Sequence, residues 1–184
     1  MSLPVHVLLV SGSLRAGSTN TAALRTAIDV GAEGVAASLY EGLRDLPHFD
    51  PGDDQAPLPQ PVIDLRAALG IADAILFCTP EYAGTLPGSF KNLLDWGVGG
   101  GELYEKPVAW VNISTGGPTG AAGAHQTLAV VLGYCGSRIV EPACAHVPIA
   151  RADVGDDGIV HDDAIRAPLH DVMSALAAAV PLSD

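Results

Sequence analysis

The stretch that decides the fold is Val5-His6-Val7-Leu8-Leu9-Val10-Ser11-Gly12-Ser13-Leu14-Arg15-Ala16-Gly17-Ser18-Thr19-Asn20. Its apolar half predicts a strand and its small-residue half a loop, and Leu24 and Ile28 at helical spacing predict a helix directly afterwards. A helix start offers unpaired amides and the positive end of a dipole. Together with several hydroxyls and the guanidinium of Arg15, these groups favour an anion, and the natural anion is a phosphate.

Two familiar phosphate loops do not fit these letters. No lysine follows Gly17, as the G-x-x-x-x-G-K-[ST] loop requires, and the spacing of Gly12 and Gly17 is not that of G-x-G-x-x-G. A loop rich in Gly and Ser can also simply connect a strand to a helix. Taken alone, the loop leaves both interpretations open.

The strand-loop-helix pattern occurs twice more. Residues 74–79 form an unbroken apolar run, a loop with Pro and Gly follows at 80–88, and the apolar residues through Trp96 predict a helix. Residues 107–114 predict another strand, and a Gly-rich segment at 115–124 leads into a helix. Both repeats therefore place a loop rich in Gly, Pro or Ser after a buried strand. We call such a loop a permissive loop.

Further strands are expected at 35–40 and 138–147, and further helices after Pro61 and over 165–180. Pro168 is expected in the first turn of the last helix, where its missing N–H costs nothing.

The long segments 46–61 and 153–163 show no periodicity. Their aspartates have no metal-ligand spacing, so both segments are predicted to be solvated surface loops or turns.

Five alternating strands and helices predict an α/β fold, a doubly wound parallel sheet with helices on both faces, within one domain over residues 1–184. In the flavodoxin-like strand order 2-1-3-4-5, the first, third and fourth strands are neighbours, and ligands bind at their carboxyl ends. The three permissive loops are therefore expected to converge on one crevice, where glycine lets the backbone approach a flat ligand.

Charge and composition exclude several function classes. Nine Lys plus Arg against 21 Asp plus Glu give a net charge of −12, which repels nucleic acid and anionic membrane surfaces. Three cysteines without a C-x-x-C pair indicate neither a disulfide framework nor a zinc site. No apolar run reaches membrane-spanning length, so a soluble, cytoplasmic protein is expected. None of the six histidines has a spacing that indicates catalysis, and no metal ligand is predicted.

Three motifs stand at the predicted crevice: Gly12-Ser13-Leu14-Arg15-x-x-Ser18-x-Asn20, then Thr79-Pro80-Glu81-Tyr82 with Pro87-Gly88-x-x-Lys91-Asn92-x-x-Asp95-Trp96, and Ser114-x-Gly116-Gly117. Together they resemble the NAD(P)H-dependent FMN reductase family, whose members include quinone, azo-dye and chromate reductases. The resemblance covers nearly the whole chain. It implies a flavodoxin-like three-layer sandwich with a five-stranded parallel sheet of order 2-1-3-4-5. It also implies bound FMN, NADPH or NADH as co-substrate, a small-molecule electron acceptor, and a homodimer or homotetramer.

The resemblance also divides the cofactor site between the loops. It places the FMN phosphate at Ser13, Arg15, Ser18, Thr19 and Asn20 of the first loop, with Arg15 as the largest contributor. It places the flavin ring against Pro80, Glu81, Tyr82, Ala83 and Gly84 on one side and Ser114, Thr115, Gly116 and Gly117 on the other. Tyr82 could equally be an ordinary, partly buried aromatic. No catalytic acid or nucleophile is expected, because hydride transfer between nicotinamide and flavin needs none.

Lys91, Asn92, Asp95 and Trp96 share one predicted helix and are expected to cap, pair and pack at a subunit interface.

The chain departs from the family at Ala83, where a polar residue such as Asn is common, so one side-chain contact near the flavin is missing. Two alternatives stay open: a flavodoxin-like electron carrier that does not react with nicotinamide, and a related binding protein without flavin. The T-x-T-G-x-T phosphate loop of short-chain flavodoxins is absent.

Overall fold

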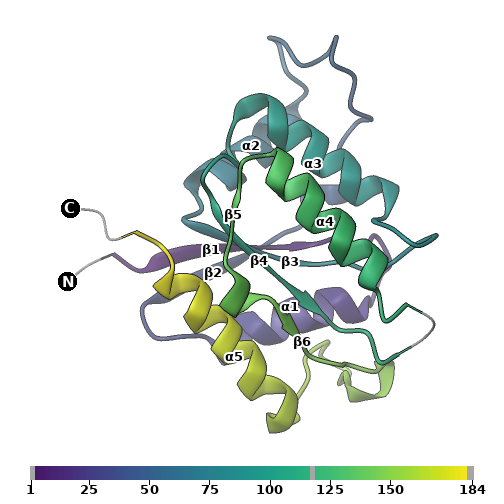
Figure 1. Cartoon of the computed structure of the whole chain (residues 1–184), viewed down its shortest axis with the longest axis vertical. Coiled ribbons are helices and arrows are strands. Elements are labelled where there is room, and N and C mark those ends of the chain that lie inside the picture. The colour runs from purple at the N-terminus through teal and green to yellow at the C-terminus, as the bar shows by residue number, and fades with distance from the viewer. Residues whose placement is uncertain (1–2, 117–118, 182–184) are drawn as a thin grey trace.

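The computed structural model describes residues 3–116 and 119–181, and it forms a parallel sheet between two layers of helices (Figure 1). The strands lie in the order β2-β1-β3-β4-β5 and are all parallel. Their bounds are β1 Val5–Ser11, β2 Val35–Tyr40, β3 Ala74–Cys78, β4 Pro107–Asn112 and β5 Arg138–Ile139. The predicted flavodoxin-like order 2-1-3-4-5 is confirmed.

Alternating side chains of the strands build one core on each face of the sheet. On β1, Val7 and Leu9 belong to one core, and Leu8 and Val10 belong to the other. Figure 1 shows α1 and α5 over the first face and α2, α3 and α4 over the second. The helices span Thr19–Val30 (α1), Gln60–Ile71 (α2), Gly88–Gly100 (α3), Ala122–Tyr134 (α4) and Asp163–Ala178 (α5). Every residue of the central strand β3 is buried, which explains its unbroken apolar sequence.

The predicted strand over 138–147 is wrong in its middle. After β5 the chain makes one turn of 3₁₀ helix, η2 (Glu141–Ala143), and then returns to β4 as β6 (Ala145–His146). Pro142 lies in this turn. Because proline has no N–H and a fixed φ, it interrupts the hydrogen-bond ladder. Two short strands therefore share the edge of β4.

The last helix begins earlier than predicted. The carboxylate of Asp162 accepts a hydrogen bond from the Ala164 N–H at 2.9 Å and caps α5. Pro168 therefore lies inside the helix, in its second turn, and its predicted place in the first turn is wrong. The capping carboxylate satisfies a free amide and sets the start of the helix.

Helix α3 continues past Trp96 through a glycine-rich segment that sequence assigns to a connection. A Cβ on Gly97 would lie 2.9 Å from Leu103 Cδ1, so the glycine allows close packing that holds the helix in place. The helix ends at Gly101, which has a φ of 81°. None of the helices in the described part of the chain is both long and apolar enough to cross a membrane.

The long segment between η1 (Gly42–Arg44) and α2 is tied to α3. Asn92 Oδ1 accepts from the Phe49 N–H at 2.7 Å, and Trp96 Nε1 donates to the Pro47 carbonyl at 2.9 Å. Phe49 packs edge-on against Trp96, with ring centroids 5.0 Å apart. Asn92 and Trp96 of α3 therefore anchor a loop of the same chain.

Two ion pairs complete this region. Asp54, predicted to be solvated, pairs instead with Arg66 at 2.7 Å, and their side chains are only 16% and 14% exposed. Lys91 and Asp95 pair at 2.5 Å along α3, as predicted. A subunit interface at α3 stays a prediction.

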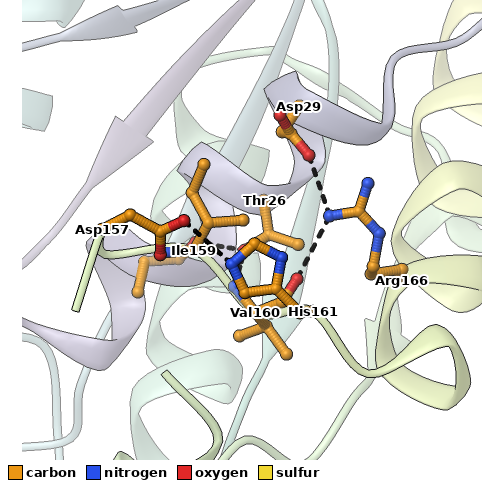
Figure 2. Close-up of polar contacts among 8 residues, drawn as sticks. Thr26, Asp29, Asp157, Ile159, Val160, His161 and Arg166 are labelled. Atoms are coloured by element: carbon orange, nitrogen blue, oxygen red, sulfur yellow. Dashed lines mark hydrogen bonds and ion pairs between the residues drawn. The ribbon is translucent and has the colours of Figure 1, made fainter. Parts of the chain in front are cut away.

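The segment after β6 folds back onto α1. It passes through η3 (Arg151–Asp153), and Figure 2 shows how its later part is held. The Val160 N–H donates to the buried Thr26 Oγ1 at 2.9 Å, and Arg166 of α5 donates to the Val160 carbonyl at 3.2 Å while pairing with Asp29 of α1 at 2.8 Å. These contacts hold the end of this segment, at Val160, beside the C-terminal half of α1.

Candidate functional site

The loops after β1, β3 and β4 meet at the carboxyl edge of the sheet, as predicted. They line a cavity of about 360 Å³, called the central cavity here, and a volume of ~300–1,000 Å³ is typical of ligand pockets. Its predicted members are Thr19, Asn20, Pro80, Glu81, Ser114, Thr115 and Gly116. The structure therefore brings residues from all three predicted loops to one place.

The other predicted residues lie around this cavity. Ser13, Arg15 and Ser18 line a second cavity of about 590 Å³ on the side of the first loop that faces β2. Tyr82, Ala83 and Gly84 form an exposed turn that, among the described residues, lines neither cavity. Gly117 lies outside the described residues.

The first loop offers donors to an anion. Ser18 caps α1, and its Oγ accepts from the Asn20 N–H at 3.2 Å. Within the described part of the chain, the amides of Leu14, Ala16 and Gly17 donate to no protein acceptor. These amides lie just before the start of α1, where the helix dipole adds positive potential. The chemistry of this donor set fits a phosphate.

The first and second loops are packed against each other through one glycine. A Cβ on Gly12 would lie 2.3 Å from Thr79 Oγ1 and 2.7 Å from Thr79 Cβ, so no larger residue fits. The Gly12 N–H donates to the Cys78 carbonyl at 2.9 Å. The first glycine of the loop therefore serves the contact between loops.

Asn20 connects the start of α1 to the end of β3. Its side chain is buried, and Asn20 Oδ1 accepts from Cys78 Sγ at 3.3 Å. Burial raises the pKa of the Cys78 thiol, which keeps it protonated and able to donate. This contact fixes the orientation of Asn20 at the wall of the central cavity.

Glu81 connects the second loop to the third. Its carboxylate accepts hydrogen bonds from the Thr119 hydroxyl and from the Ala124 N–H, the latter at 3.1 Å. The bond from Thr119, followed by those from the start of α4, holds the pKa of Glu81 below its usual range. The sequence predicts Glu81 only as part of the ring-binding backbone, whereas its side chain joins two walls of the cavity.

The exposed turn that follows Glu81 is tight. Tyr82 and Thr85 exchange backbone hydrogen bonds of 3.0 and 3.1 Å, and Ala83 and Gly84 both have positive φ, 50° and 77°. This turn packs against α4, because a Cβ on Gly123 would lie 2.2 Å from the Gly84 carbonyl oxygen. The side chain of Tyr82 is 53% exposed, so it projects from the turn into solvent.

The third loop is held by residues that the sequence does not single out. Asn112 Oδ1 accepts from the Ser114 N–H at 2.9 Å, and Asn112 Nδ2 donates to the Gly120 carbonyl at 2.9 Å. His146 Nε2 donates to the Ser114 carbonyl at 2.7 Å. Gly116 has a φ of 130°, which requires glycine. The loop that ends at Gly120 is thus closed by a side chain of β4 and braced from β6.

The two cavities differ in charge. The described lining of the central cavity contains one carboxylate, that of Glu81, and no lysine or arginine. The second cavity, by contrast, is lined by Arg15 of the first loop and by Arg25, Arg44 and Arg151. The central cavity therefore suits an uncharged, flat group, and the first loop suits an anionic one.

Comparison with known proteins agrees with this arrangement. Residues 5–152 match the family described as NADPH-dependent FMN reductase. A probable NADPH:quinone oxidoreductase 2 of Oryza sativa is 30% identical over 181 residues, which cover 95% of this chain and 88% of the relative. A quinone reductase of Pseudomonas putida is 29% identical, covering 88% of each chain.

Among solved structures, the flavoenzyme NAD(P)H:(acceptor) oxidoreductase FerB of Paracoccus denitrificans superposes with a TM-score of 0.80 at 27% identity. The match covers 96% of this chain and 97% of that structure. The family match spans most of the chain and includes all three loops of the site. The chain belongs to the NADPH-dependent FMN reductase family.

Proposed function

We propose that the protein is an FMN-dependent oxidoreductase that takes reducing equivalents from NADPH or NADH and passes them to a small-molecule acceptor, such as a quinone, an azo dye, a metal ion or free flavin. The observation that carries the proposal is that the first loop, with its free donors for an anion, meets a central cavity whose described lining has no lysine or arginine, on three loops of one sheet edge. A flavin mononucleotide has this division between a flat ring and a phosphate.

In this proposal the first loop holds the phosphate. The free amides of Leu14, Ala16 and Gly17 and the hydroxyls of Ser13 and Ser18 supply directional donors, and Arg15 supplies the charge. Thr19 and Asn20 continue this surface into the central cavity. The helix dipole contributes only ~0.3–1 kcal/mol, so the charge-assisted hydrogen bonds of Arg15 dominate.

The second and third loops hold the ring. In this proposal Pro80 and Glu81 flank one edge, and Ser114, Thr115 and Gly116 flank the other. The contacts of Tyr82, Ala83, Gly84 and Gly117 with the ring stay predictions. When bound, FMN supplies the hydride chemistry, which the protein supports without an acid or base of its own. The proposed roles of the chain are to orient the ring, to exclude water from one side of it, and to stabilise negative charge on it with backbone amides of the third loop.

Glu81 is the one carboxylate in the described lining of the central cavity, and in this proposal its hydrogen bonds reduce its repulsion of a reduced, electron-rich ring. The amide at the start of α4 and the hydroxyl of Thr119 both donate to it. Its charge is therefore directed away from the ring site, toward the positive end of a helix.

Anaerobic turnover tests the proposal. Protein supplemented with FMN is mixed with NADPH or NADH and with each of a small panel of quinones, an azo dye, chromate and free flavin, and its FMN content is measured in parallel. We expect nicotinamide oxidation that depends on the protein and is much reduced in Arg15→Gln. FMN binding without any reaction with either nicotinamide would instead identify an electron carrier, and absence of FMN binding would reject both.

We also propose that the protein is a homodimer or homotetramer. Light scattering, with and without FMN, tests this oligomeric state.

A further inference from the structure

A second cavity lies beside the first loop, and its lining is rich in arginine. Its volume is about 590 Å³, and it is bounded by residues 13–18, the end of β2 with η1, and the segment 151–158. Four of the seven arginines of the chain line it: Arg15, Arg25, Arg44 and Arg151. We call it the arginine cavity.

Among the described residues, three of the four arginines of this cavity pair with no carboxylate, although the chain has 21 acidic residues. In the described part of the chain, Arg15, Arg44 and Arg151 form no ion pair, and Arg25 only approaches Glu41, at 3.7 Å between half-exposed side chains. Elsewhere Arg66 and Arg166 pair with aspartates at 2.7 and 2.8 Å. Because the proposed function assigns Arg15 to the flavin phosphate, the guanidinium groups of Arg25, Arg44 and Arg151 are the ones available for a second anionic ligand.

Three acidic residues also line the cavity, and their surroundings reduce the repulsion that they would exert on an anionic ligand. Asp157 accepts from the Ile159 N–H at 3.1 Å and from His161 Nε2 at 2.8 Å. Glu41 faces solvent with a side chain that is 76% exposed and has Arg25 beside it. Asp156 is exposed at the outer end of the turn. The four arginines outnumber the three acidic residues of the lining, in a molecule whose total charge is −12.

Hydrogen bonds and an ion pair hold the walls of the arginine cavity in place. Arg44 donates to the Leu14 carbonyl, which joins η1 to the first loop. Val160 and Arg166 hold the segment that carries Arg151 against α1 and α5 (Figure 2). Arg151 Nη2 lies 4.0 Å from the position of a Cβ on Gly17, so this guanidinium reaches the outer side of the first loop.

We propose that the arginine cavity binds a phosphate monoester of the co-substrate, the 2′-phosphate that NADPH has and NADH lacks. The inference rests on the proposed function. The two cavities adjoin along the first loop, since Ser18 lines one and Thr19 the other, and the loop tip between them is exposed. An extended dinucleotide can therefore lie across the tip with its nicotinamide over the central cavity. Guanidinium groups bind a terminal phosphate through paired hydrogen bonds.

Steady-state kinetics with the FMN-supplemented protein test this assignment. In Arg25→Gln and Arg151→Gln the ratio of kcat/KM for NADPH to kcat/KM for NADH should fall about tenfold or more, the effect of losing one charge-assisted phosphate contact. The matched control is Arg138→Gln, which removes the same charge at β5, outside the cavity, and should keep the ratio. An unchanged ratio in both cavity variants would overturn the proposal.

A binding experiment separates this proposal from the proposed function. The probes are 2′,5′-ADP, 5′-AMP and inorganic phosphate, titrated by calorimetry into the FMN-supplemented protein and its variants. We expect 2′,5′-ADP to bind at least about tenfold more tightly than 5′-AMP, and Arg25→Gln and Arg151→Gln to remove the difference.

Binding of 2′,5′-ADP by a protein that oxidises neither nicotinamide would retain the phosphate site and reject the proposed function. Equal affinity for 2′,5′-ADP and 5′-AMP would overturn the phosphate site. A loss of FMN affinity in Arg25→Gln and Arg151→Gln as large as the loss for NADPH would also overturn it, because the arginines would then serve the flavin phosphate.

Discussion

Arg15 is the residue on which the anchoring of the flavin phosphate depends. It is exposed on the first loop and forms no ion pair in the described part of the chain. We expect Arg15→Gln to weaken FMN binding roughly 10- to 100-fold, because one or two charge-assisted hydrogen bonds are lost. Quenching of flavin fluorescence measures the affinity. Riboflavin, which has no phosphate, is the control ligand, and an equal loss of affinity for riboflavin would contradict this role.

Ala83 occupies a backbone conformation that does not suit alanine. Ala83 and Gly84 both have positive φ, the pattern of a type I′ turn, in which Asn-Gly is the favoured pair. We expect Ala83→Asn to raise the free energy of unfolding by about 1 kcal/mol, because Asn tolerates the left-handed region better. Thermal unfolding measures the change. The control is Ala67→Asn, an exposed position in α2, where Asn should instead lower stability slightly.

Residues that act through sequence neighbours could be predicted, and residues that act across the fold could not. The first loop, the Pro80 motif and Ser114 to Gly116 are short motifs next to buried strands, so their letters carry the information. Thr119 and His146 hold the third loop through contacts with residues far away in the sequence, which no local spacing reveals. His146, for example, reaches Ser114, 32 positions earlier in the chain.

At the scale of elements, Glu81 couples the second loop to the start of α4. Because its folded-state pKa lies below the usual value, the carboxylate stabilises the fold above its unfolded pKa of about 4.3, and this stabilisation is lost as pH falls through the folded-state pKa. We therefore expect Glu81→Gln to unfold at a lower temperature than the natural protein at neutral pH.

Differential scanning fluorimetry over a pH series measures this difference. The gap between Glu81→Gln and the natural protein should narrow as pH falls to around 4 and below. Glu33→Gln, at an exposed position in the connection before β2, controls for the loss of one negative charge. A gap that stays constant with pH would contradict the carboxylate's role.

Pro168 lies in the second turn of α5, where its ring disturbs the helix and an intrahelical hydrogen bond is missing. We expect Pro168→Ala to raise the free energy of unfolding by about 1–3 kcal/mol. Chemical denaturation measures the gain. The control is Pro61→Ala. Because Pro61 lies at the start of α2, its replacement should not raise the free energy of unfolding.

Element types followed from periodicity, whereas element limits depended on single residues and on tertiary packing. The apolar runs at β1, β3 and β4 sufficed to predict a buried parallel sheet, because such strands need no alternation. The break at Pro142, the cap at Asp162 and the continuation of α3 through Gly97 each reflect one local contact. A pattern averaged over ten residues does not detect contacts of this kind.

At the scale of the whole molecule, arginines cluster in one region although the net charge of the chain is negative. A net charge of −12 repels anionic ligands at long range, while four arginines gather around the loop that is proposed to hold phosphates. Screening by salt weakens the long-range repulsion more than the short contacts. The molecule therefore depends on close, directional contacts to hold anionic ligands.

The proposed single domain should unfold as one unit, and FMN should stabilise it. Both cores lie on the same sheet, and α5, from the end of the chain, packs against α1, from its beginning. A ligand that binds only the folded state at about 100 times its Kd adds about 2.7 kcal/mol at 25 °C. Calorimetry should show one transition that FMN shifts upward, while Arg15→Gln shows a smaller shift at the same FMN concentration. Two separate transitions, or a shift equal in Arg15→Gln and the natural protein, would contradict this expectation.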